Sequence, residues 1–201
     1  MISLLLPTRN RLDYLKMAVE TIRRQDCSEW EIVVSDNASD EDIAGWVQSL
    51  EDGRVLYART PRFVPVTENW NAALALSSGD YVLMMGDDDG LLPGYVTRMR
   101  KLTERFEQPD LIYSGALLLT YPGVDPEHME GLLEVWTHAE FFRKETAPFL
   151  LPRDRAVAAV RRVMDFKFVY PFNMQLSLVS RSLIERVQRH GGFGRPPAGD
   201  H

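Results

Sequence analysis

The sequence predicts an α/β fold in which a mostly parallel sheet is flanked by helices. Short apolar segments alternate with amphipathic ones over residues 1–110, and turn residues separate them. The apolar segments are continuous, as in buried parallel strands whose crossover helices cover both faces of a sheet. The alternation breaks up beyond residue 120. We therefore expect a sheet-forming half at 1–110 and a smaller, less regular half at 111–201.

Short apolar runs predict the positions of the strands in the first half. The expected strands are, in chain order, 3–6, 31–35, 55–57, 81–85 and 110–119. After the first strand, Leu15, Val19 and Ile22 recur at the spacing of a helix. Later helices should begin at residues that favour helix starts, and we expect Asp40 and Thr67 as caps and Pro93 as a first helical residue.

The second half is less regular. We expect an irregular stretch at 125–152, a helix at 155–164, a strand at 174–179 and a helix at 180–190. A loop rich in Gly and Pro follows at 191–199, close to the last residue. A folded domain rarely stops inside such a loop, so we expect the chain to be truncated at its C-terminus relative to a longer protein.

Composition excludes several classes of protein. Of 201 residues, 45% are hydrophobic and 26% are charged, as in ordinary globular proteins. The net charge of −6 disfavours nucleic acid as a partner. The single Cys27 excludes an internal disulfide and a cysteine-based zinc site. Without a membrane-spanning run or a secretory signal, we expect a cytoplasmic protein. Basic residues near the C-terminus suit either solvated helix faces or peripheral contact with the inner face of an anionic membrane.

Polar segments follow the first four strands, where ligands bind in open α/β sheets. These segments are 7–11, 36–40, 59–62 and 86–90, and they are basic, acidic, basic and acidic in turn. This pattern suits a ligand with anionic groups and hydrogen-bonding rings, such as a nucleotide with a metal. Thr8 and Arg9 would contact a base or phosphate, or simply end the strand. Asp36 would accept from a base N–H, and Asn69 is either a ligand contact or a surface residue.

The acidic segment holds three consecutive carboxylates, Asp87, Asp88 and Asp89. Adjacent carboxylates repel one another unless a cation neutralises them. Oxygen ligands favour Mg²⁺ or Mn²⁺, so we expect a metal site here rather than a plain solvated turn. Other chemistries lack their motifs, because the chain has no G-x-G-x-x-G after a strand, no P-loop, no G-x-S-x-G and no H-E-x-x-H.

Four motifs together resemble a family-two glycosyltransferase of the GT-A fold. They are LPTRNR at 6–11, VVSDNASD at 33–40, NWNAAL at 69–74, and GDYV at 79–82 leading to GDDD at 86–89. The resemblance implies an inverting transferase with a nucleotide-sugar donor, commonly UDP-linked, and Mn²⁺ or Mg²⁺ on a DXD motif. The family's common first Asp is replaced by Gly86, so the motif here is Asp87-x-Asp89.

By matched position, the resemblance implies roles for particular residues. Asp36 would bind the base edge, Asp88 the ribose, and Asp89 with Asp87 the metal. The expected nucleotide-sugar contacts are Pro7, Thr8, Arg9, Asp36, Asn37, Arg62, Asn69, Asp87 and Asp88. The loop at 63–65 lacks the glycine common in the family, which leaves its phosphate contacts open.

The expected function is sugar transfer to a hydroxyl of a saccharide or lipid-linked acceptor, in surface polysaccharide or glycolipid synthesis. Residues 1–110 would bind the donor and 111–201 the acceptor. Two alternatives stay open. A sugar-nucleotide nucleotidyltransferase would need a glycine-rich loop after the first strand, and 7–11 contains no glycine. A non-catalytic nucleotide- or glycan-binding module would share the site without the turnover.

Inverting transfer also needs a general base for the acceptor hydroxyl. We expect Asp200, because it follows a Gly- and Pro-rich loop that can fold back over the sheet edge. It also lies about as far beyond the metal motif as the base does in the resembling family. His201 is a weaker alternative, Asp154 is the next carboxylate to examine, and the plain alternative for Asp200 is a terminal residue without a role.

Overall fold

A computed structural model describes residues 1–136, 147–166 and 174–190 of the chain. The chain divides into two compact units. The first holds Met1–Ile112 and the segment from Ser177 onward, and the second is Tyr113–Leu176. The first division lies close to the expected boundary after 110. The return of the later segment to the first unit was not expected.

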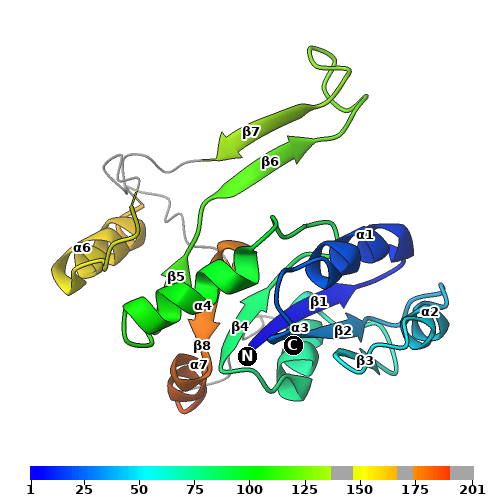
Figure 1. Ribbon diagram of the computed structural model, residues 1–201, viewed down its shortest axis with the longest axis horizontal. Helices are drawn as coiled ribbons and strands as arrows, with labels where there is room; N and C mark the ends of the chain where they lie inside the picture. Colours follow the sequence, from blue (N-terminus) through cyan, green and yellow to red (C-terminus); the bar gives the residue numbers. More distant parts are fainter. Residues whose placement is uncertain (137–146, 167–173, 191–201) are drawn as a thin grey trace. The chain divides into compact units, whose positions relative to one another are not determined.

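The first unit is built on a six-stranded sheet of order β3-β2-β1-β4-β8-β5 (Figure 1). The strands are β1 Ile2–Thr8, β2 Trp30–Asp36, β3 Val55–Arg59, β4 Tyr81–Met84, β5 Leu111–Tyr113 and β8 Ser177–Ser180. β1 pairs in parallel with β2 and β4, and β2 with β3, whereas β8 runs antiparallel to β4. The predicted α/β class with a mostly parallel sheet is confirmed.

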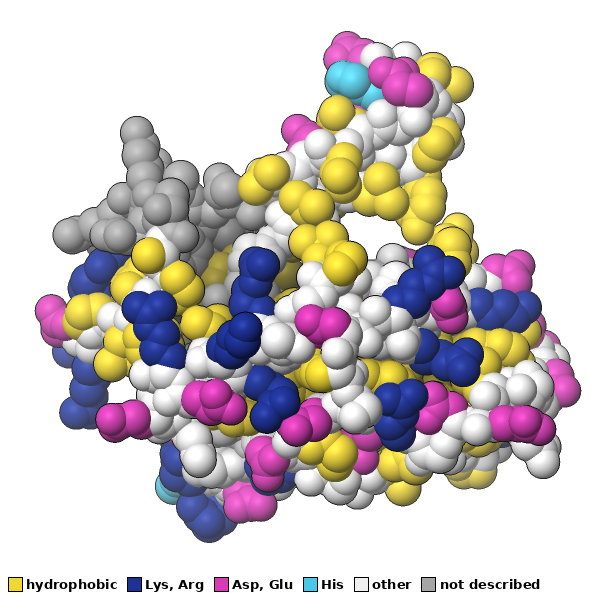
Figure 2. Space-filling view, viewed as in Figure 1, with side chains coloured by type: hydrophobic (Ala, Val, Ile, Leu, Met, Phe, Trp, Pro, Cys, Tyr) yellow, Lys and Arg dark blue, Asp and Glu magenta, His cyan; other side chains and the backbone are white. Residues whose placement is uncertain are grey.

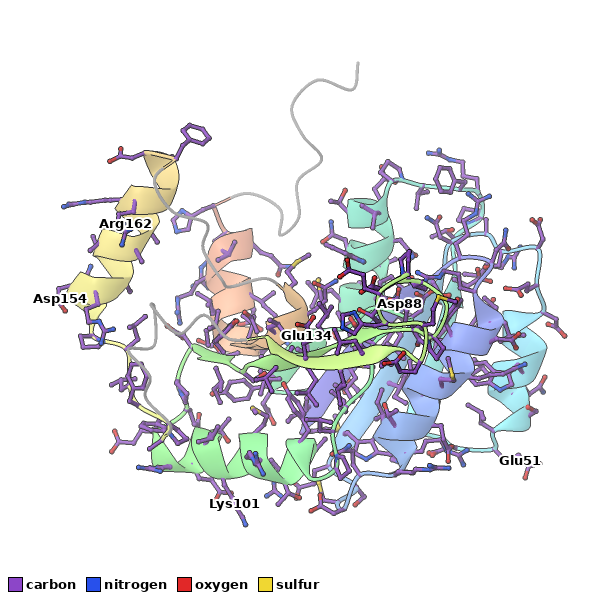
Figure 3. The ribbon with its side chains drawn as sticks, turned by 90° about the horizontal axis from the view of Figure 1, so that it is seen from above. Glu51, Asp88, Lys101, Glu134, Asp154 and Arg162 are labelled. Atoms are coloured by element: carbon purple, nitrogen blue, oxygen red, sulfur yellow. The ribbon has the colours of Figure 1, made fainter. Side chains whose placement is uncertain are left out.

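Helices cover both faces of this sheet (Figures 1 and 3). The helices of this unit are α1 Leu12–Arg23, α2 Ile43–Ser49, α3 Val66–Leu76, α4 Tyr95–Arg105 and α7 Arg181–Gln188. Residues alternate between faces along a strand, so Leu4 and Leu6 of β1 join one core with the buried residues of α1, α2 and α4. α3 packs on β1 and β2 from the other face, where α7 also lies.

Two predicted helix caps are wrong. Asp42, rather than Asp40, caps α2, because its Oδ1 accepts the N–H of Gly45 at 2.9 Å. Asp40 instead exchanges two hydrogen bonds with the side chain of Asn10, at 2.7 and 3.2 Å. Thr67 lies inside α3, which already begins at Val66. The first error chooses the wrong one of two neighbouring aspartates, whereas α3 begins after Pro65 with no side-chain cap.

The start of α4 also differs from the prediction. Pro93 lies before the helix rather than at its first position, and Gly94 is the cap residue. Gly94 has φ of +74°, a left-handed conformation that glycine adopts without steric cost. The helix therefore begins at Tyr95, directly after this left-handed residue.

The second unit contains a hairpin that the sequence did not predict. The single strand expected at 110–119 is broken after Tyr113, and β6, Ala116–Thr120, pairs antiparallel with β7, Leu132–Trp136. β7 lies in the stretch expected to be irregular. One face of the hairpin carries four exposed apolar side chains, and Figure 2 shows apolar side chains along it. They are Leu117, Leu119, Leu133 and Val135.

The rest of the second unit matches its prediction more closely. α6, Arg153–Met164, is the helix expected at 155–164, with Asp154 in its first turn. A short 3₁₀ turn, Met174–Leu176, precedes β8, so the expected strand starts three residues later than predicted. The two ends of the second unit are joined by a hydrogen bond, in which the N–H of Ser114 donates to the carbonyl of Leu176 at 3.0 Å. None of the described helices has the length and apolar character of a membrane span.

Candidate active site

The carboxyl ends of β1, β2 and β4 meet at one edge of the sheet. Thr8 is the register partner of Asp36, and the N–H of Asn37 donates to the Thr8 carbonyl at 2.9 Å. The Thr8 hydroxyl donates to Oδ2 of Asp87 at 2.7 Å. The structure therefore brings three of the predicted polar segments together. Asp88, which belongs to the last of these segments, is labelled in Figure 3.

Asp36 is fully buried at this edge and has three donors. Its Oδ1 accepts the N–H of Ser39 at 2.8 Å, across a turn in which Ala38 has φ of +53°. Its Oδ2 accepts from the Tyr57 hydroxyl at 2.8 Å and from Arg59 at 2.9 Å. Burial, together with the hydrogen bond to Asp36, raises the pKa of Tyr57 above its ordinary value. Both carboxylate oxygens of Asp36 are therefore already paired within the protein.

Sequence reasoning did not single out Tyr57 or Arg59. Both lie on β3, and Arg59 belongs to the basic segment after the third strand, which is the one signal that points to it. Their partnership with Asp36 depends on β3 pairing with β2, with Arg59 opposite Asp36 in register. The electrostatic environment of Asp36 is thus set by a neighbouring strand.

The amides of Asn37 and Asn69 bind other parts of the protein. Asn37 donates to the Val64 carbonyl at 2.8 Å and accepts the Val64 N–H at 2.9 Å. Asn69 accepts from the Ser35 hydroxyl at 2.7 Å and donates to its carbonyl at 3.0 Å. Both side chains are buried. They hold α3 and the loop before it against β2, so in this structure they support the site.

The three consecutive carboxylates are held by different groups. Asp87 is 4% exposed and contacts Arg11 at 3.0 Å in addition to Thr8. Burial raises the pKa of Asp87, and Thr8 and Arg11 partly offset that rise. Asp88 is exposed and accepts from the other branch of Arg11 at 2.7 Å. Oδ2 of Asp89 accepts the N–H of Gly86 at 2.9 Å, which closes the turn.

This arrangement fits a divalent cation at Asp89 better than at Asp87. Among the residues that the structure describes, no three Asp, Glu, His or Cys side chains converge into a ready-made metal site. Asp87 is enclosed by Thr8 and Arg11, whereas Asp89 is exposed at the end of the strand. A single exposed carboxylate suits a hard cation whose other oxygen ligands come from a diphosphate and water.

The remaining predicted residues lie at the rim or outside the described part. The guanidinium of Arg9 stacks over the ring of Phe63 at 4.3 Å, which joins the β1 end to the loop before α3. Arg62 is exposed in that loop, and Pro7 is half-buried within β1. Asp200 and His201 lie outside the described residues.

The chain is similar in sequence to known proteins. The chain matches the family model for glycosyl transferase family 2 over residues 3–168. It is 36% identical over 109 residues to the GalNAc(5)-diNAcBac-PP-undecaprenol beta-1,3-glucosyltransferase of Campylobacter jejuni, which covers 52% of this chain and 35% of that protein. It is 27% identical over 123 residues to a PGL/p-HBAD biosynthesis glycosyltransferase of Mycobacterium bovis, which covers 59% and 47%. The chain thus spans about a third to a half of these relatives.

A solved structure supports the fold. The mannosyltransferase PcManGT of Pyrobaculum calidifontis, in complex with GDP-Man and Mn²⁺, aligns with 96% of this chain and 47% of its own, with a TM-score of 0.52 and 20% identity. At this identity the likeness concerns the fold alone. Together with the family match, it confirms the resemblance that the four ordered motifs indicated. The chain therefore belongs to glycosyltransferase family 2 and has the GT-A fold.

Proposed function

We propose that this chain transfers a sugar from a UDP-linked donor to a hydroxyl acceptor with the help of a divalent cation. The observation that carries the proposal is the meeting of Thr8, Asp36 and the Asp87–Asp89 segment at the carboxyl edge of a parallel sheet in a family 2 chain. Ligands bind at this edge in open α/β sheets.

The donor would lie across the ends of β1, β2 and β4. In this proposal Pro7, Thr8 and Arg9 lie beside the nucleobase, and Asp36 accepts from its N–H. Asp88 contacts the ribose. The guanidinium groups of Arg9, which stacks on Phe63, and of the exposed Arg62 lie beside this space and suit a diphosphate. Asn37 and Asn69 act by holding the loop and α3 that bound this space.

The cation would be Mn²⁺ or Mg²⁺, held by Asp89 with Asp87 close by. When bound, it would neutralise the charge that develops on the diphosphate as it leaves. The exposed carboxylate of Asp89 supports this assignment. The Mn²⁺ in the mannosyltransferase complex makes this ion the first to test, and its GDP-Man makes GDP the nucleotide to compare with UDP.

The acceptor would be a saccharide or a lipid-linked saccharide, bound by the second unit. The Campylobacter relative is named for an undecaprenol-diphosphate-linked acceptor. We accordingly place the reaction in surface polysaccharide or glycolipid synthesis, on the cytoplasmic side and in peripheral contact with the membrane. Asp200 is the proposed base that takes the acceptor's proton, with inversion at the anomeric carbon.

A thermal-shift and calorimetric titration with UDP and GDP, each with and without Mn²⁺, tests the donor and the metal together. A ligand at about 100 times its Kd stabilises the fold by about 2.7 kcal/mol. For a chain of this size that is a rise in Tm of about 5–10 °C. We expect UDP to exceed GDP, Mn²⁺ to enlarge the shift, and Asp89→Ala to remove the Mn²⁺-dependent part.

Asp13→Ala is the matched control, because Asp13 is an exposed aspartate on α1. An equal Mn²⁺ response in wild type and Asp89→Ala would contradict the metal assignment. A larger shift with GDP would replace UDP as the donor nucleotide. Slow Mn²⁺-dependent hydrolysis of the UDP-sugar separates an enzyme from a binding module, which would bind UDP without hydrolysing its sugar conjugate.

A further inference from the structure

The guanidinium of Arg11 bridges two of the three consecutive carboxylates. Its NH1 lies 3.0 Å from Oδ1 of Asp87, and its NH2 lies 2.7 Å from Oδ2 of Asp88. Both branches of the guanidinium fork are therefore engaged, one with a buried carboxylate and one with an exposed carboxylate. Arg11 comes from the cap position of α1, so this contact joins the β1–α1 turn to the β4 end.

The positive charge of Arg11 compensates the negative charges of the carboxylates that it contacts. Three carboxylates in consecutive residues repel one another, and the burial of Asp87 makes its negative charge costly without a partner. In the described structure the cation that lies against them is Arg11. Its side chain is 42% exposed, and its guanidinium also lies over the ring of Tyr14 at 4.9 Å, a residue at the surface, so it can turn away from the cluster without unpacking the core.

The same contact bears on a divalent cation. A positive charge at hydrogen-bonding distance from Asp87 and Asp88 weakens the attraction of the segment for a further cation. A diphosphate changes this balance, because it brings negative charge and offers the guanidinium fork a second bidentate acceptor.

We propose that Arg11 makes cation binding at the Asp87–Asp89 segment depend on the nucleotide diphosphate, an inference that rests on the proposed function. Without a nucleotide, Arg11 serves as the counterion of the segment. With a nucleotide, the diphosphate restores the attraction for the cation and competes for Arg11. Arg11 is a positioning residue in this scheme, since it acts through the carboxylates that it holds.

The test is Mn²⁺ binding to the whole chain, measured by calorimetry or by the loss of the free Mn²⁺ paramagnetic resonance signal, without nucleotide and then with UDP or GDP. Arg11→Ala should bind free Mn²⁺ on the order of tenfold more tightly than wild type, because a neighbouring positive charge is gone. The gain in Mn²⁺ affinity on adding nucleotide should shrink correspondingly. Arg11→Lys keeps the charge and should stay near wild type.

Arg24→Ala is the matched control. Arg24 follows α1 directly and also pairs with a carboxylate, that of Glu20 at 2.8 Å, which is not one of the three consecutive carboxylates. It removes the same charge and should leave Mn²⁺ affinity unchanged. If Arg11→Ala fails to fold, Arg11→Gln replaces it, since Gln is neutral and can still bond one carboxylate. The same increase in free Mn²⁺ affinity is expected of it.

The outcomes separate the inference from the function on which it rests. If wild type binds Mn²⁺ with nucleotide while the neutral variants bind free Mn²⁺ no more tightly than wild type, the inference is overturned and the metal site stands. A lower Tm without a change in Mn²⁺ affinity would likewise assign Arg11 a purely structural role. If wild type binds no Mn²⁺ with either nucleotide, the metal part of the proposed function fails first.

Discussion

Replacing Glu31 tests how the amino-terminal edge of the sheet is held, at the opposite end of the strands from the site. Glu31 is 7% exposed, and its carboxylate accepts four hydrogen bonds. The Ser3 hydroxyl donates at 2.6 Å, the Ser78 N–H at 2.5 Å, the Ser78 hydroxyl at 2.8 Å and the Gly79 N–H at 3.1 Å. These bonds tie β1, β2 and the turn before β4 together.

The magnitude follows from what each substitution leaves unpaired. Glu31→Ala leaves buried hydrogen-bond donors without an acceptor, and each such donor lowers the free energy of unfolding by about 1–3 kcal/mol. The N–H of Gly79 keeps a second acceptor, the Ser3 hydroxyl. Since such losses are not additive, we expect a total near 3 kcal/mol, or about 6–12 °C in Tm. Glu31→Gln keeps one acceptor oxygen and loses the charge, so about 1–2 kcal/mol is expected.

The direction of the pKa shift of Glu31 determines how the stability of the fold should change with pH. Burial alone would raise the pKa of Glu31, but the bonds from Ser3, Ser78 and Gly79 lower it by more, so its pKa lies below the ordinary value. Such a group stabilises the fold fully above its unfolded pKa of about 4.3, and that stabilisation is lost as pH falls through the folded pKa. The difference in the free energy of unfolding between wild type and Glu31→Gln should therefore decrease below about pH 4.3.

The assay is urea unfolding of wild type, Glu31→Gln and Glu31→Ala between pH 3 and pH 7, with UDP affinity measured at pH 7. A gap that stays constant or widens towards low pH would refute the reasoning, as would an alanine variant as stable as wild type. UDP affinity should be unchanged in folded variants, because the site lies at the other edge of the sheet.

Three further predictions concern single carboxylates. Asp42→Ala should lower stability by about 1 kcal/mol, seen as a lower urea midpoint, because it removes the α2 cap, whereas Asp40→Ala should cost less; the reverse order would contradict the cap. Asp36→Ala should weaken calorimetric UDP binding more than Asp40→Ala, and equal losses would defeat the base-edge assignment. Asp200→Asn in the full-length protein should lower turnover at least ~10²-fold with UDP affinity unchanged; near-normal turnover would direct attention to Asp154.

The central sheet was predictable because its strands are continuous apolar runs between turn residues, a local signal. The meeting of the segments after β1, β2 and β4 was predictable from the general rule for parallel sheets. The hairpin partner β7 was missed, because the connection at 121–131 is too long for a tight hairpin turn and the apolar run of β6 merged with that of β5. Local patterns also failed to choose between Asp40 and Asp42, since both suit a helix start.

The side-chain partners at the site were beyond sequence reasoning. Arg11 lies in a segment that the sequence marked as polar, but its contact with Asp88 joins residues 77 positions apart. Similarly, Asp36 meets Arg59 only through the pairing of β2 with β3. Such contacts follow from strand order and register, whereas residue type alone indicates only that a charged group needs a partner.

The way in which the second unit joins the first bears on how this enzyme family diversifies. The chain leaves the sheet at β5 and returns at the adjacent strand β8. The intervening 63 residues, from 114 to 176, are therefore an insertion whose two ends lie next to each other. An insert whose ends are adjacent can be lengthened, shortened or exchanged without altering the register of the strands that carry the nucleotide edge. Under the proposed function, in which the second unit binds the acceptor, the residues between β5 and β8 can change while the strands that carry the proposed donor site keep their pairing.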